Sequence, residues 1–251
     1  PALPADHAEL KWLQKNNYKI LKRSQVLGEI TKSFKTVAIA GTHGKTTTTT
    51  MVTHILKTAG FNCYAFLGGI SRNYGTNLLL GDANSEQEAY VVVEADEYDR
   101  SFMTLFPFAT IITSVDADHL DIYGNKEEME KTYEAFATQV REDGFLLVKK
   151  NVDNTLRLKN KRLTYSVISI PTSSGSDFQA NDLRVENAEF YFDLQTPTGS
   201  LKNLHCGIPG KHNVENATAA AGICKLLGVS DEKIREALHT FTGVKRRFDY
   251  R

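Results

Sequence analysis

The feature that most constrains this chain is the run TVAIAGTHGKTTTTTMV at residues 36–52. An apolar segment enters a turn flanked by glycines, and a lysine and five threonines follow. A turn of this kind between a buried strand and a helix directs several backbone N–H groups, and the positive end of the helix, towards one point, which suits a phosphate group. The run therefore predicts nucleotide binding within an α/β fold. The simpler alternative is a glycine turn followed by a lysine that is merely exposed to solvent.

The side chains of this run have different expected roles. Lys45 offers a mobile cation for the outer phosphates, and the hydroxyl of Thr46 can ligate Mg²⁺. Thr47 and Thr48 fall in the first helical turn, within reach of phosphate or of the loop, whereas the last two threonines are expected to be ordinary helix residues. The loop is shorter than usual, because only two residues separate its two glycines. The predicted nucleotide-binding residues are Gly41, Thr42, His43, Gly44, Lys45, Thr46 and Thr47.

Composition excludes several classes of partner. The 30 Lys and Arg residues balance the 30 Asp and Glu residues, so no net field favours nucleic acid or an anionic membrane. No apolar run reaches the roughly 20 residues of a spanning helix. The scattered cysteines, Cys63, Cys206 and Cys224, fit no disulfide or metal spacing and are expected to be buried apolar residues of a cytoplasmic protein. The opening PALPADH, without a methionine, suggests a trimmed piece, and nothing indicates an oligomeric state.

Apolar strands alternate with helices through the first part of the chain. This pattern predicts a mostly parallel, P-loop-type sheet covered on both faces by helices. Residues 8–35 are expected to form a helix, a short strand and a second helix. After the run at 36–52, whose helix should end at Gly60, strands are expected at 61–67, 89–95, 109–115 and 144–150, with a helix at 126–140.

The pattern of apolar and polar residues changes between residues 163 and 209. Turn signals come at short spacing and apolar residues alternate with polar ones, which predicts a small, largely antiparallel β unit joined to the parallel sheet. Helices are then expected at 213–228, ended by Gly228, and at 231–241, capped by Ser230.

Two acidic groups follow predicted strands. The first is Glu94 with three further acids, in EADEYD at 94–99, and the second is DADHLD at 116–121, which contains His119. Carboxylates and imidazoles at the carboxyl ends of neighbouring parallel strands are where phosphoryl transfer holds its metal. Beside a phosphate loop, the two groups predict Mg²⁺ sites, although either could consist of ordinary loop residues.

Five motifs together identify a family. AGTHGKTTTT, VEADEYDRSF, DADHLDIYG, PGKHNVENATAA and GVKRRFDY occur in this order between residues 36 and 251 and resemble the central domain of the Mur ligases. These enzymes have three domains. The resemblance implies that residues 1–35 are the tail of an N-terminal UDP-sugar-binding domain, that 36–251 are the central ATP-binding domain, and that a C-terminal amino-acid-binding domain is absent from this chain.

The resemblance also implies an activity. It is ATP-dependent amide formation between UDP-N-acetylmuramate and L-alanine through an acyl phosphate, a step of peptidoglycan precursor synthesis. The alternative within the family is a recycling ligase that adds a ready-made tripeptide to UDP-N-acetylmuramate. Folylpolyglutamate synthase fits the motifs less well, and a nucleotide-binding switch would not need a second anionic site. The chain alone is expected to bind Mg-ATP and to catalyse little or no ligation.

The resemblance assigns roles to individual residues. Lys45, Glu94 and His119 are the implied catalytic residues. Lys45 would bind the β- and γ-phosphates, Thr46 and Glu94 would hold one Mg²⁺, and His119 would help to hold a second metal. His212 and Asn216, four residues apart at a helix start, resemble residues that contact the nucleotide from the far side, and Arg247 resembles an arginine that approaches the phosphates.

One position departs from the family pattern. Several related ligases carry a carbamylated lysine about 14 residues beyond the histidine of DHLD, and Tyr133 stands there in this chain. Glu134 could supply an oxygen ligand instead, although a surface helix position is the simpler reading. The ligands of the second metal therefore stay open.

Overall fold

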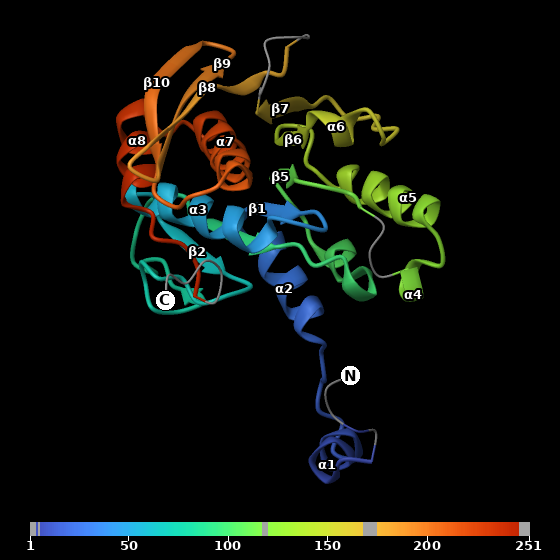
Figure 1. Ribbon diagram of the computed structural model, residues 1–251. Coiled ribbons are helices and arrows are strands. Elements are labelled where there is room, and N and C mark those ends of the chain that lie inside the picture. The colour runs from blue at the N-terminus through green and yellow to red at the C-terminus, as the bar shows by residue number, and fades with distance from the viewer. Residues whose placement is uncertain (1–3, 5, 117–119, 168–174, 246–251) are drawn as a thin grey trace.

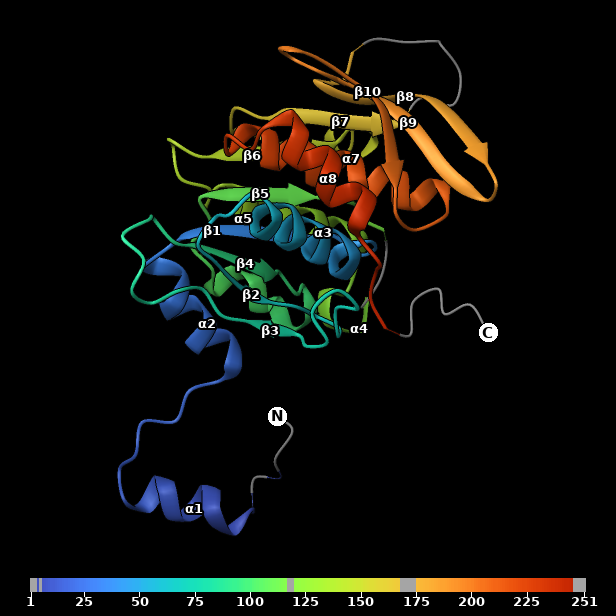
Figure 2. The ribbon, with the colours of Figure 1, turned by 90° about the vertical axis from the view of Figure 1, so that its left-hand side faces the viewer.

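The chain forms three layers, with one large sheet between two layers of helices (Figure 1 and Figure 2). The computed structural model describes residues 4, 6–116, 120–167 and 175–245. The sheet has ten strands in the order β10-β9-β8-β7-β6-β5-β1-β4-β2-β3. From β2 to β8 every neighbouring pair is parallel, which confirms the predicted α/β architecture. The strands are β1 (Lys35–Ala40), β2 (Cys63–Phe66), β3 (Leu78–Leu79), β4 (Tyr90–Glu94), β5 (Ala109–Ile112), β6 (Phe145–Lys149), β7 (Leu163–Val167), β8 (Phe178–Glu186), β9 (Glu189–Thr196) and β10 (Gly199–Cys206).

Helices cover both faces of this sheet. Helices α3, α7 and α8 lie on one face, and α2, α5 and the 3₁₀ helix η1 lie on the other. The helices are α1 (Ala8–Lys15), α2 (Arg23–Lys32), α3 (Lys45–Thr58), η1 (Tyr98–Thr104), α4 (Leu120–Tyr123), α5 (Lys126–Ala137), α6 (Lys150–Asp153), α7 (Lys211–Leu226) and α8 (Asp231–Thr240).

The two faces of β1 supply two separate cores. Val37 and Ile39 pack into the cluster under α3, α7 and α8, while Ala38 and Ala40 pack into the cluster under α5 and η1. Successive side chains of a strand point to opposite faces, so a strand covered on both sides must be apolar throughout. This explains why TVAIA reads as a continuous apolar run.

The region after residue 163 differs in part from the prediction. Strands β8, β9 and β10 form the expected antiparallel unit, but β7 pairs parallel with both β6 and β8 and therefore extends the parallel sheet. Its side chains are unevenly buried, because Thr164 and Tyr165 are buried while Leu163, Ser166 and Val167 are partly exposed, although α6 and α7 both contact this strand. The short β3, antiparallel to β2, was not predicted.

The first 35 residues contain two helices, and the short strand predicted between them is wrong for the described residues. Helix α1 stands away from the body of the chain in both ribbon views and has no buried residue. Trp12 stacks on Tyr18 at a ring distance of 5.6 Å, so the chain turns back on α1 where a strand was expected. Helix α2 contacts η1.

Smaller predictions about packing and helix ends are confirmed. All three cysteines are free and buried, and burial raises the pKa of the Cys63 thiol to about 12. The Ser230 hydroxyl caps α8 by accepting from the N–H of Lys233. Gly60 and Gly228 follow the ends of α3 and α7 with φ of 81° and 89°.

None of the helices in the described residues has both the length and the apolar character to cross a membrane.

We predict that the antiparallel unit depends on Phe178 of β8. Its buried ring lies where a side chain at Gly222 of α7 would be, about 3.1 Å from a Cβ built there. Phe178→Ala should lower the free energy of unfolding by about 3–5 kcal/mol, measured by urea denaturation. Val185→Ala is the matched control, because Val185 lies on the same strand with 58% of its surface exposed, and should cost less than about 0.5 kcal/mol. Equal losses for both variants would contradict this packing.

Candidate functional site

The loop of residues 41–44 connects the carboxyl end of β1 to the start of α3. Both of its glycines have positive φ, 132° at Gly41 and 82° at Gly44. A Cβ at Gly41 would lie 2.1 Å from the hydroxyl oxygen of Thr113, so no other residue fits there without displacing the neighbouring strand end. Gly44 is the N-cap of α3, and the loop therefore turns directly into the positive end of a 14-residue helix.

Two residues beyond β5 hold this loop, and the sequence reasoning missed both. The N–H of Thr42 donates to the carbonyl of Ser114 at 3.1 Å, and the N–H of His43 donates to the Ser114 hydroxyl at 2.8 Å. The Thr113 hydroxyl donates to the carbonyl of His43 at 2.5 Å. The sequence signal for both is their position directly after an apolar strand and just before the acidic group at 116–121.

Helix α7 supports the loop from the other side. Asn216 is buried, and its Oδ1 accepts from the Thr48 hydroxyl at 3.2 Å. The same Oδ1 lies 2.6 Å from the point where a Cβ at Gly44 would be, so Asn216 contacts the loop backbone closely. The structure thus brings Asn216 to the predicted site. His212 is an exposed residue of the first turn of α7.

The threonine tract becomes helix interior within one turn, as predicted. Thr49 and Thr50 are fully buried, and their hydroxyls donate to the carbonyls of Lys45 and Thr46 at 2.8 and 2.7 Å. A threonine that bonds back to the carbonyl four residues earlier needs no other polar partner. The tract can therefore lie between the sheet and two other helices without an unsatisfied hydroxyl.

Thr46 and Glu94 meet where β1 and β4 end side by side. Ile39 of β1 is in register with Glu94 of β4, and the Thr46 hydroxyl donates to Glu94 Oε1 at 3.1 Å. A Cβ at Gly68 would lie 2.0 Å from Glu94 Oε2, so this glycine leaves the space that the carboxylate fills. A hydroxyl and a carboxylate in contact are the hard oxygen donors that Mg²⁺ prefers.

Lys45 points back over the loop. Its ammonium donates to the carbonyl of Gly41 at 2.7 Å and to Glu97 Oε1 at 2.9 Å. The carbonyl of Glu97 in turn accepts from the Tyr123 hydroxyl at 2.6 Å. Burial, followed by the charge of Glu97, raises the pKa of the Tyr123 phenol to about 12, so this hydroxyl stays a neutral donor at ordinary pH. Of the acids in EADEYD at 94–99, Glu97 is thus the one that contacts the lysine.

The second acidic group is described in part. The N–H of Asp116 donates to the Thr42 hydroxyl oxygen at 3.1 Å, and its carboxylate lies 3.7 Å from the exposed imidazole of His43. His119 and Arg247 lie outside the described residues. Within the residues that are described, no three His, Cys, Asp or Glu side chains gather as a metal-binding group. Of the predicted metal ligands, Thr46 and Glu94 are therefore the pair that the structure brings together.

Tyr133 and Glu134 face different surroundings on α5. Tyr133 is fully buried against Phe102, with ring centroids 5.3 Å apart, and burial raises the pKa of its phenol. Glu134 accepts the N–H of Arg157 at 2.7 Å, which agrees with the simpler reading of a helix residue with a structural contact.

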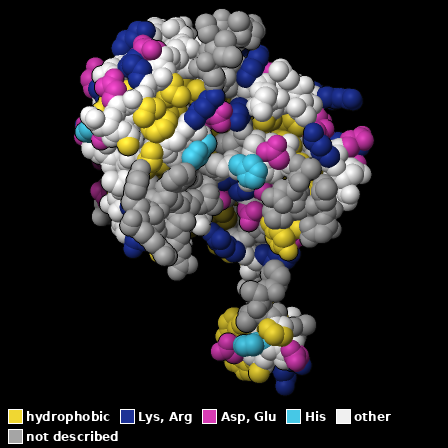
Figure 3. Space-filling model, in the orientation of Figure 1, with side chains coloured by type: hydrophobic (Ala, Val, Ile, Leu, Met, Phe, Trp, Pro, Cys, Tyr) yellow, Lys and Arg dark blue, Asp and Glu magenta, His cyan; other side chains and the backbone are white. Residues whose placement is uncertain are grey.

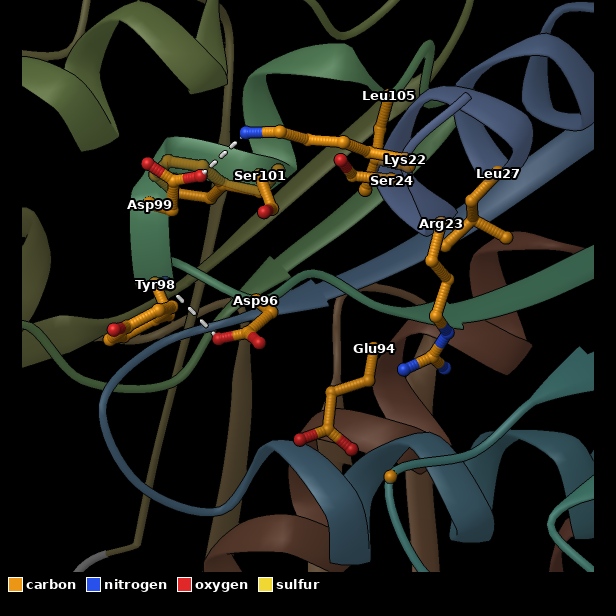
Figure 4. Close-up of a pocket in the computed structure, with 12 residues that line it drawn as sticks. Lys22, Arg23, Ser24, Leu27, Glu94, Asp96, Tyr98, Asp99, Ser101 and Leu105 are labelled. Carbon is orange, nitrogen blue, oxygen red and sulfur yellow. Dashed lines mark hydrogen bonds and ion pairs between the residues drawn. The ribbon is translucent and has the colours of Figure 1, made fainter. Parts of the chain in front are cut away.

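A pocket of about 390 Å³ adjoins Glu94 (Figure 4). Lys22, Arg23 and Ser24 at the start of α2 line one side, and Glu94 and Asp96 line another. The pocket is open to solvent on the face where acidic, basic and histidine side chains gather in Figure 3. Cations and carboxylates therefore face one another beside the oxygens of Thr46 and Glu94.

Comparison with known proteins places this chain in a family. A sequence model described as the Mur ligase middle domain matches residues 39–224. A UDP-N-acetylmuramate–L-alanine ligase from Phocaeicola vulgatus is 43% identical over all of this chain, and one from Parabacteroides distasonis is 44% identical. The chain spans 53% of each relative, or about half its length.

Solved structures agree with the fold. A UDP-N-acetylmuramate–alanine ligase from Thermotoga maritima superposes with a TM-score of 0.82 at 28% identity, covering 99% of this chain and 55% of the other. A murein peptide ligase from Psychrobacter arcticus superposes with a TM-score of 0.78 at 23% identity, covering 99% of this chain and 55% of the other, and shows the same fold.

We predict that the loop tolerates no side chain at Gly44. Gly44→Ala should destabilise the chain by about 1–2 kcal/mol for the left-handed backbone, and by about 1–3 kcal/mol more for the collision with Asn216. Gly60→Ala is the matched control, because Gly60 has nearly the same φ with no atom within 4 Å of the added Cβ. Urea denaturation of both variants gives the difference. A loss no larger at Gly44 than at Gly60 would show that Asn216 does not pack closely on the loop.

Proposed function

Because this chain belongs to the Mur ligase family, we propose that it is the nucleotide-binding part of an enzyme that uses ATP to join L-alanine to UDP-N-acetylmuramate. The observation that carries this proposal is the contact between Thr46 and Glu94 at the mouth of a glycine loop whose lysine faces the same space. The alanine-adding relatives, which match the whole chain at 43% and 44% identity, support the choice of amine substrate.

The nucleotide is proposed to bind on the loop of residues 41–44. Its phosphates would accept from the backbone N–H groups at the start of α3, where the helix end is positive. Lys45 would contact the β- and γ-phosphates, and Thr47 lies two residues further into the same turn. Asn216 and His212 of α7 are proposed to approach the nucleotide from the other side, and Arg247 to approach the phosphates.

Thr46 and Glu94 are proposed to hold Mg²⁺, and His119 to help with a second ion. The fit rests on the chemistry of the donors, since a hydroxyl and a carboxylate oxygen lie 3.1 Å apart at the end of β4. When bound, Mg²⁺ would neutralise phosphate charge. The protein itself would hold these oxygens in place in two ways. Gly68 leaves room for the Glu94 carboxylate, and the register of β4 with β1 sets Glu94 beside the loop.

The pocket beside Glu94 is proposed to receive the acid substrate. Lys22 and Arg23 on its rim would offset the charge of an incoming carboxylate and of the UDP diphosphate. The muramate carboxylate oxygen would then attack the γ-phosphorus, the bond to the β-γ bridging oxygen would break, and ADP would leave. The amine of L-alanine would next attack the acyl carbon, phosphate would leave, and the new amide nitrogen would lose its extra proton. The task of Lys45 in the first step is to bring two anions together.

We also propose a role for each part of the chain. Residues 1–35 would be the tail of a UDP-sugar-binding domain, and 36–251 the ATP-binding domain. Residues that bind the amino acid would come from a further domain, which is consistent with relatives about twice the length of this chain. This chain alone would then bind Mg-ATP without appreciable ligation.

Product formation tests the proposed reaction. In the full-length protein to which we assign this chain, ADP release would be measured with Mg-ATP and UDP-N-acetylmuramate. L-alanine and the tripeptide L-Ala-γ-D-Glu-diaminopimelate would be offered in separate reactions. Turnover with alanine is expected. Turnover with the tripeptide alone would refute the alanine assignment and support the recycling ligase.

Two substitutions test the phosphate and metal assignments. Lys45→Ala should lower kcat/KM at least about 100-fold, because a cation that stabilises transferred phosphate is lost. Thr46→Val should lower kcat/KM by a comparable factor, and excess Mg²⁺ should only partly restore it. Thr46→Ser keeps the hydroxyl and should retain most of the activity. Steady-state kinetics and thermal unfolding of each variant make the comparison. Equal activity of Thr46→Val and Thr46→Ser would contradict a metal-binding hydroxyl.

A further inference from the structure

Glu97 is a buried acid for which the proposed reaction has no role. It lies three residues beyond β4, and its side chain is only 2% exposed. Its carboxylate faces the ammonium of Lys45: Oε1 accepts a hydrogen bond at 2.9 Å, and Oε2 lies 2.7 Å from the same nitrogen as an ion-pair contact. Both carboxylate oxygens thus lie against the lysine that the proposed function assigns to the phosphates.

The ammonium has a limited number of donors to share. It carries three N–H groups, of which the carbonyl of Gly41 takes one and Glu97 takes another. The lysine side chain is itself only 13% exposed, so water screens this ion pair poorly. One N–H group therefore remains for a phosphate that enters the loop, and that phosphate must share the charge of the cation with Glu97.

Glu97 cannot easily move away to make room. Its carbonyl is fixed by the Tyr123 hydroxyl at 2.6 Å, and η1 begins at the next residue. Asp99 and Arg100 in this segment have left-handed backbones, each with φ of 53°, although neither is a glycine. The backbone that carries this carboxylate therefore stays beside Lys45 whichever partner the ammonium contacts.

We infer that Glu97 is a positioning residue that competes with the nucleotide phosphates for Lys45. It holds the ammonium over the loop, limits the affinity of the site for ADP and ATP, and takes the ammonium back when ADP leaves. A ligase gains from this arrangement because a cationic loop without a nearby anion would retain its diphosphate product. This inference rests on the proposed nucleotide site and adds the residue that sets its affinity.

The test measures nucleotide affinity in the chain as it stands, by isothermal titration calorimetry. Glu97→Gln keeps the shape and one acceptor oxygen but removes the charge, so Mg-ADP should bind about tenfold more tightly. AMP has no β-phosphate to reach Lys45, and its affinity, measured by displacement, should change less than about twofold. Glu130→Gln is the matched control, since Glu130 forms an ion pair with Lys126 on α5 away from the loop and the same chemical change there should leave Mg-ADP affinity unchanged.

A double-variant cycle shows whether the effect acts through the lysine. In a Lys45→Met background, Glu97→Gln should give no comparable gain in Mg-ADP affinity, because the contested cation is gone. A gain as large as in the wild-type background would overturn the inference, as would unchanged or weaker Mg-ADP binding by Glu97→Gln. If Glu97→Gln does not fold, Glu97→Asp replaces it. The shorter acid should hold Lys45 less well and tighten Mg-ADP binding, and no tightening would again overturn the inference.

The same titrations separate this inference from the proposed function. If the wild-type chain binds Mg-ADP and Glu97→Gln binds it no more tightly, competition by Glu97 is wrong and the nucleotide site stands. If neither the wild-type chain nor any variant binds Mg-ADP, the nucleotide site and the competition fail together.

Discussion

The parallel pairing of β1 between β4 and β5 is the constraint on which the rest of the site depends. Parallel strands end at the same edge of a sheet, so the loop after β1, Glu94 at the end of β4 and Thr113 just beyond β5 come together there. Each contributes a different group: N–H donors, a carboxylate and a hydroxyl. A slip of one residue in the pairing of β1 with β4 would turn Glu94 to the opposite face and separate it from Thr46.

Close packing around small residues makes this edge precise. Gly41, Gly44 and Gly68 each lie where a Cβ would come within 2.6 Å of another side chain, and the groups they admit are a hydroxyl, an amide and a carboxylate. The polar groups therefore contact the backbone itself. Because the surrounding helices α3 and α7 are buried along most of their length, these contacts have little freedom to relax.

The charged side chains at the site pair with one another, just as the positive and negative charges of the whole chain balance. Lys45 faces Glu97, and Lys22 faces Asp99 across the neighbouring pocket. The first pair is buried and the second is more than half exposed, so water and salt weaken the second far more than the first. An anionic ligand therefore meets a strongly held cation at the loop and weakly held cations at the rim.

The sequence by itself determined the fold class, the glycine loop between β1 and α3, and the identity of most of the residues around it. These are local properties: an apolar strand, a turn that needs glycine and a helix start each leave their mark on consecutive residues. Only the tertiary structure decided that Ser114 and Thr113 hold the loop, that Asn216 closes over Gly44, and that Glu97 rather than its acidic neighbours contacts Lys45. Those contacts join residues 52 to 168 positions apart. Hydrophobic burial of the strands and helices that carry these residues brings them together, and no local pattern predicts it. The same reason explains the misjudged β7, whose direction depends on which strand it lies beside and not on its own residues.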